Sequence, residues 1–95
     1  MNYTELLKTA SMAVYNDIVN IKTSLAGAIL VESIDSYSFV RGGKKVMEVD
    51  DLTTAYLNNA TSYNGVSLEA TKHFVNMDNV EVSMIVASVC MESIN

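Results

Sequence analysis

The stretch SYSFVRGGKKVMEV, residues 36–49, decides the fold class of this chain. Polar and apolar residues alternate on both sides of Gly42 and Gly43, and alternation is the pattern of a strand with one buried face. A two-residue hairpin turn needs positive φ angles, which glycine adopts at little steric cost. The sequence therefore predicts a β-hairpin over about 36–49. The side chains expected to face the core are Tyr37, Phe39 and one of Val46 and Met47.

The chain before this hairpin has the pattern of a long helix. Asn2 is a suitable N-cap, and Glu5 follows it at the spacing of a capping box. Apolar residues then recur with the helical period of 3.6 residues. They are Leu7, Ala10, Val14, Ile18, Ile21, Leu25 and Ile29. We expect a helix to about residue 25, while the apolar stretch 28–34 after Gly27 fits either a continued helix or a buried strand.

Two shorter elements are expected after the hairpin. Asp50 is a suitable N-cap for a short helix at 51–59. Residues 63–66, Tyr-Asn-Gly-Val, have the chemistry of a hairpin turn. Ser67 is nevertheless also a good N-cap, and Glu, Ala and Lys are poor strand formers. These features favour a turn followed by a helix at 68–75.

The last segment is apolar almost all round. Asp78 and Glu81 have capping-box spacing, which favours a helix at 79–93. Its β-branched residues also suit a buried strand, so 80–92 is compatible with both. The polar residues form one narrow stripe, made of Glu81, Ser88 and Glu92. Such an element must be covered on most of its sides.

The composition places these elements in one small, apolar unit. Of the 95 residues, 49% are hydrophobic and 18% are charged, and none is proline. A chain of this length has little interior in which to bury apolar side chains. The predicted fold class is α+β: a mostly helical single domain over 1–95 with one β-hairpin, a long N-terminal helix and an apolar C-terminal helix.

The apolar surplus concentrates in the first helix and the last segment, and we expect a second copy or another protein to cover it. The predicted interface consists of Val14, Ile18, Ile21, Leu25, Met84, Ile85, Val89 and Met91. The leading hypothesis is a small non-enzymatic protein that self-associates or binds another protein. An assembly or inhibitor protein of a phage or mobile element fits this size.

Charge and cysteine content exclude several other classes. The net charge is −5, which disfavours nucleic-acid binding because that needs a basic face. Cys90 is the only cysteine and cannot form an internal disulfide, which indicates a reducing compartment. The longest uncharged run, between Lys22 and Glu32, is too short to span a bilayer. The first residues lack the pattern of a signal peptide, so we expect a cytoplasmic location and no membrane contact.

Arg41, Lys44 and Lys45 form the one basic cluster of the chain. On a hairpin tip they would project into solvent, where charges keep an edge strand soluble. The alternative function is an oligomeric protein that binds an anionic or nucleotide-like ligand through this tip. The sequence favours the solvated turn over the ligand site.

No constellation of residues points to catalysis, to a metal or to a cofactor. Glu48, Asp50 and Asp51 lack the glycine and the closing glutamate of a calcium loop. His73 is the only histidine, and no motif supplies it with an orienting carboxylate and a nucleophile. Cys90 lies in the apolar last segment, as expected of a buried small hydrophobe. We therefore expect no enzymatic activity.

The order of helix, glycine-turn hairpin and short helix within residues 1–59 resembles that of small phage head–tail joining proteins of the lambda W type. The matching stretch is Ser36–Leu57, with RGGK (41–44) at the turn and DDL (50–52) opening the helix. The segment between the first helix and the hairpin is longer here, and the residues after 59 have no counterpart. The resemblance implies a non-enzymatic assembly protein that oligomerises through helices.

Overall fold

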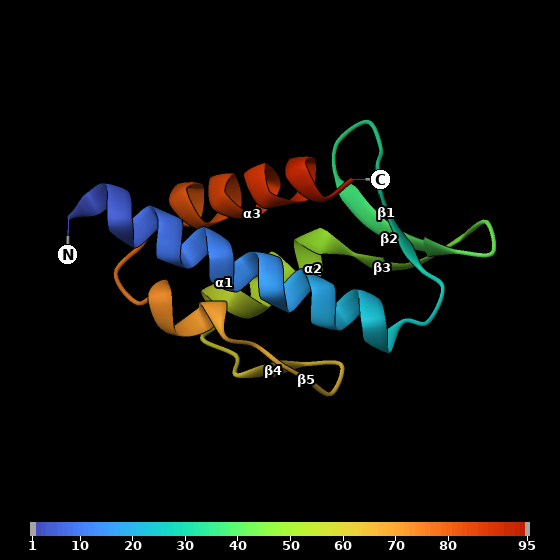
Figure 1. Ribbon diagram of the computed structural model, residues 1–95, viewed down its shortest axis with the longest axis horizontal. Coiled ribbons are helices and arrows are strands. Elements are labelled where there is room, and N and C mark those ends of the chain that lie inside the picture. Colours follow the sequence, from blue (N-terminus) through green and yellow to red (C-terminus); the bar gives the residue numbers. More distant parts are fainter. Residues whose placement is uncertain (1, 95) are drawn as a thin grey trace.

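The chain folds as helices packed with two small antiparallel sheets, and the structure, a computed structural model, describes residues 2–94. In chain order the elements are α1 (Tyr3–Ser24), β1 (Ile29–Glu32), β2 (Tyr37–Arg41), β3 (Lys44–Glu48), α2 (Val49–Leu57), β4 (Ser62–Tyr63), β5 (Val66–Ser67), the 3₁₀ helix η1 (Ala70–His73) and α3 (Asn79–Ser93). In Figure 1, α1 and α3 lie side by side and run in the same direction, with the three-stranded sheet toward their C-terminal ends. The predicted α+β class is confirmed.

The two long helices begin where their caps predict. The side chain of Asn2 accepts a hydrogen bond from the Glu5 N–H at 2.8 Å, and that of Asp78 accepts one from the Glu81 N–H at 2.9 Å. Each bond satisfies a backbone donor that the first helical turn leaves without a partner. The helical alternative for 80–92 is therefore the correct one.

Of the two alternatives for the segment 28–34, a continued helix and a strand, the strand is correct. Gly27 has a φ of +82°, which turns the chain out of α1 and into β1. β1 pairs antiparallel with β2, from Ile29 opposite Val40 to Glu32 opposite Tyr37. The predicted hairpin is thus the β2–β3 part of a three-stranded sheet with the order β1-β2-β3.

The β2–β3 hairpin itself forms as expected. Gly42 and Gly43 adopt φ angles of +59° and +76°, the left-handed region that a two-residue turn requires. Phe39 and Met47 are buried and lie opposite each other, whereas Val46 is exposed. Directly opposed residues share one face of a sheet, so this pair marks the side of the hairpin that meets the core.

Asp50 is not the N-cap of α2, which corrects the sequence prediction. The helix begins at Val49, directly after β3, and Glu48 occupies the cap position without a side-chain cap bond. Val49 is buried, so packing fixes the junction between strand and helix earlier than the cap pattern suggests. Asp50 and Asp51 lie in the first turn, where carboxylates interact favourably with the helix dipole.

The segment 62–73 also differs from the favoured prediction. Asn64 and Gly65 have positive φ angles and connect β4 to β5, so the hairpin alternative is correct. The helix expected at 68–75 shortens to the single turn η1. The backbone N–H groups of Glu69 and Ala70, before and at the start of η1, donate to a buried side chain of α1 and fix where this turn begins.

That side chain is Asp17, which is fully buried. Its Oδ2 accepts from the Tyr56 hydroxyl at 2.7 Å and from the Ala70 N–H at 3.0 Å, and its Oδ1 accepts from the Glu69 N–H at 2.8 Å. Burial raises the pKa of Tyr56, and the hydrogen bond to Asp17 raises it further. The Tyr56 hydroxyl therefore stays protonated and acts as the donor. Asp17 thereby joins α1, α2 and η1.

We predict that Asp17→Ala lowers the free energy of unfolding by about 3 kcal/mol or more, because it leaves one hydroxyl and two N–H groups without an acceptor. Tyr56→Phe should cost about 1–3 kcal/mol, since two of the three bonds remain. Urea unfolding followed by circular dichroism measures both. Asp35→Ala, in the exposed turn between β1 and β2, is the control and should change stability by less than about 0.5 kcal/mol. Equal losses in Asp17→Ala and Asp35→Ala would contradict this role.

Candidate interaction surface

Most residues of the predicted interface lie inside the chain's own core. Val14, Ile18 and Ile21 of α1 are buried, as are Ile85 and Val89 of α3, and Leu25 packs against the same cluster. These side chains are buried within one chain, where α1 contacts α3, η1 and β5, and α3 also contacts α2 and β1. Of the eight, Met84 and Met91 remain available to a partner, each with 66% of its surface exposed.

A second apolar stripe runs along the outer side of α1, and the sequence prediction missed it. Met12, Tyr15 and Val19 are 59%, 50% and 41% exposed and follow one another at helical spacing. The signal in the sequence is the presence of large apolar residues off the main 3.6-residue stripe. We define the α1 stripe as Lys8, Met12, Tyr15, Val19 and Lys22, and the α3 stripe as Glu81, Met84, Ser88 and Glu92.

The two stripes border a groove between α1 and α3. A hollow of about 510 Å³ lies between Met12 and Tyr15 on one side and Val89 and Glu92 on the other. A second hollow of about 280 Å³ lies beside Leu7, Met84 and Ile85. Ser11 lines both hollows, so they adjoin each other, and both have a mainly apolar lining. We call the two adjoining hollows the groove, and its apolar lining suits the side chains of a helix rather than a small polar ligand.

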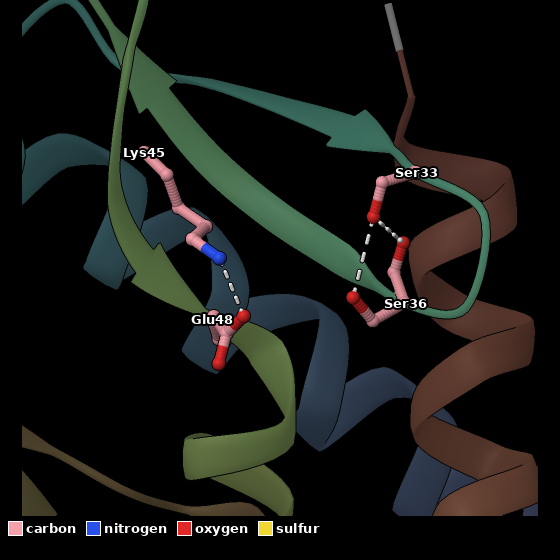
Figure 2. Close-up of polar contacts among 4 residues, drawn as sticks. All are labelled: Ser33, Ser36, Lys45 and Glu48. Atoms are coloured by element: carbon pink, nitrogen blue, oxygen red, sulfur yellow. Dashed lines mark hydrogen bonds and ion pairs between the residues drawn. The ribbon is translucent and has the colours of Figure 1, made fainter.

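The basic cluster lies at the tip of the β2–β3 hairpin, as predicted. Arg41, Lys44 and Lys45 are exposed there. Figure 2 shows that Lys45 turns back along the strand to Glu48, with 2.7 Å between its Nζ and the Glu48 Oε1. An ion pair this exposed contributes little to stability, but it draws one of the three cations away from the tip. Ligand binding by the cluster stays a prediction.

Figure 2 also shows the turn that connects β1 to β2. The Ser33 N–H donates to the Ser36 carbonyl oxygen at 2.8 Å, and the Ser33 hydroxyl donates to the same oxygen at 3.1 Å. The two hydroxyl oxygens are 3.3 Å apart. These contacts close the turn locally, so its serines serve the backbone rather than a ligand site.

The titratable residues considered for chemistry are not gathered into one site. His73 borders a third hollow of about 430 Å³, which adjoins the groove at Tyr3 and Glu81, whereas Cys90 is fully buried in the core. The Glu81 carboxylate in that hollow accepts from the Tyr3 hydroxyl at 3.0 Å, which raises the pKa of Tyr3. Across residues 2–94, His, Cys, Asp and Glu form no group of three that would hold a metal ion.

No helix within the described part of the chain combines the length and the apolar character needed to cross a bilayer.

Comparison with models of protein families, with curated proteins and with solved structures finds no match to this chain. The role implied by the resemblance to phage joining proteins therefore stays a prediction.

Burial raises the pKa of the Cys90 thiol from its ordinary value of 9.0 to about 12. We predict that a thiol reagent at pH 8 modifies the native protein about a thousandfold more slowly than the urea-unfolded chain, because so little thiolate is present. Well below pH 9 the thiol is protonated in both states, so its ionisation does not affect stability there. Between pH 9 and 12 it ionises in the unfolded chain first, so stability should fall over that interval. Equal reaction rates in native and unfolded protein would contradict the buried position.

Proposed function

We propose that this chain is a non-enzymatic protein that works by binding another polypeptide along the groove between α1 and α3. The observation that carries the proposal is the groove between α1 and α3, which is bordered by the exposed side chains of Met12, Tyr15 and Met84 although the core of the protein is formed by other residues. A contiguous apolar surface in water is unfavourable, and one rimmed by charged residues is typical of protein interfaces.

The side chains of the groove fit that role. Met12 and Met84 are flexible and polarizable, so they adapt to the shape of an incoming helix. Tyr15 and Tyr3 present an apolar ring with a polar end, the residue type enriched where interfaces meet water. The Tyr3 hydroxyl donates a hydrogen bond to Glu81, and this bond holds the Tyr3 ring near the end of the groove.

The prediction is that a photoreactive amino acid at Tyr15 cross-links a defined protein, either this chain or another, in the cell that produces it. Met12→Glu combined with Met84→Glu should abolish that cross-link, because two carboxylates would be desolvated on binding. The free energy of unfolding should change by less than about 0.5 kcal/mol, since both methionines are exposed. Mass spectrometry of the cross-linked species is the readout.

The matched control places the photoreactive residue at Val46, an exposed apolar position of β3 outside the groove. Cross-linking at Val46 should not report the same protein. Absence of any defined product at Tyr15, or the same products from both positions, would count against a binding function of the groove.

A further inference from the structure

We propose that the occupant of the groove is a second copy of this chain, related by a two-fold axis that runs parallel to α1 and α3. Each α1 stripe then lies over the α3 stripe of the other copy. This inference rests on the proposed binding function of the groove and adds the identity and the orientation of the partner.

The first argument is the charge of the two stripes. The α1 stripe has a lysine at each end, Lys8 and Lys22, and the α3 stripe has a glutamate at each end, Glu81 and Glu92. No basic residue occurs anywhere in the sequence of α3. The face of one chain therefore pairs a stripe that carries two lysines with a stripe that carries two glutamates, and a second copy turned about the axis between them offers the opposite charge to each stripe.

The second argument is that these charges are not neutralised by ion pairs within the chain. Across residues 2–94 the ion pairs are Lys45–Glu48 and Lys72–Glu69, neither of which involves a residue of the two stripes. Glu81 accepts a hydrogen bond from the Tyr3 hydroxyl, which is not an ion pair. The four stripe charges can therefore pair across an interface without first breaking an ion pair.

The third argument is the parallel course of the two helices (Figure 1). The Tyr3–Glu81 contact brings their N-terminal ends level, and Tyr15 and Glu92 border the same hollow farther along. Lys8 follows Tyr3 by five residues, or about 7.5 Å of helix rise. A lysine and a glutamate, both long side chains, span that offset, so Lys8 of one copy reaches Glu81 of the other.

Two face-to-face dimers with two-fold symmetry are possible, and they differ in which charges meet across the interface. An axis parallel to the helices lays α1 over the partner's α3 twice, and each contact places the lysines of an α1 stripe opposite the glutamates of an α3 stripe. An axis perpendicular to the helices within the same face lays α1 on α1 and α3 on α3, which sets the glutamates of one α3 against those of the other. Like charges at an interface disfavour association, and both dimers are closed, so charge decides for the parallel axis.

The test uses two charge-reversal variants, Lys8→Glu and Glu81→Lys, alone and mixed, with association constants from sedimentation equilibrium at low salt. The unmodified chain should form dimers. Each variant alone should dimerise about tenfold more weakly, because each dimer then contains two like-charge contacts.

An equimolar mixture of the two variants should form heterodimers that recover the original affinity. In such a heterodimer the carboxylate introduced at position 8 of one chain meets the ammonium group introduced at position 81 of the other. The second contact, between the unchanged Lys8 and the unchanged Glu81, keeps its original charges. Every contact across the interface then joins opposite charges again.

Two controls separate the position of a charge from the net charge of the chain. Lys44→Glu makes the same change as Lys8→Glu, but at the hairpin tip, and should leave association unchanged. Asp35→Lys makes the same change as Glu81→Lys, but in the exposed turn between β1 and β2, and should also leave association unchanged. A loss in Asp35→Lys equal to that in Glu81→Lys would overturn the charge argument.

The remaining outcomes are also decisive. If Lys8→Glu dimerises as well as the unmodified chain, or if the mixture recovers nothing, the proposed orientation is wrong. A chain that stays monomeric at a concentration on the order of several hundred micromolar, where even weak specific dimers form, rules out a second copy. The photochemical cross-link at Tyr15 would then still decide the binding function separately, since it would identify a different protein in the groove.

Discussion

The fold depends on one buried carboxylate. Asp17 lies on the inner face of α1, and its two oxygens accept hydrogen bonds from a tyrosine of α2 and from two backbone N–H groups at the start of η1. A buried carboxylate is costly unless such bonds replace its water, and here three donors converge on it. Tyr56 adds an edge-on aromatic contact to Phe74, with ring centroids 5.2 Å apart. The short segment after β5 therefore has a defined place although it has almost no regular structure of its own.

Local chemistry made part of this architecture predictable. The caps at Asn2 and Asp78 and the glycine pair of the hairpin each act over a few residues, so the sequence pattern is sufficient to locate them. The predictions that were wrong or left open concern segments whose structure depends on contacts with residues distant in the sequence. Nothing local distinguishes β1 from more helix, because only pairing with β2 satisfies its backbone. Likewise, the bonds that fix the start of η1 run from the Glu69 and Ala70 N–H groups to Asp17, which is far away in the sequence.

The candidate interaction surface was likewise only partly predictable from the sequence. Periodicity correctly identified the apolar face of each long helix, but it does not say whether that face meets the chain's own core or a partner. Val14 and Ile21 lie in the core because the fold contains enough other elements to cover them. What remains for a partner is the weaker outer stripe around Met12 and Tyr15. A stripe of three apolar residues between two lysines is too short to stand out until the inner face is known to be occupied.

The parallel arrangement of α1 and α3 also has an electrical consequence. Neighbouring helices that run the same way align their dipoles, which repel each other side by side, and acidic residues in both first turns, Glu5 and Glu81, offset the positive poles. At the other end, Lys22 lies in the last turn of α1, whereas α3 has no basic residue there. The negative pole of α3 is therefore uncompensated by its own helix. A basic residue of a neighbouring molecule would therefore interact favourably with the last turn of α3.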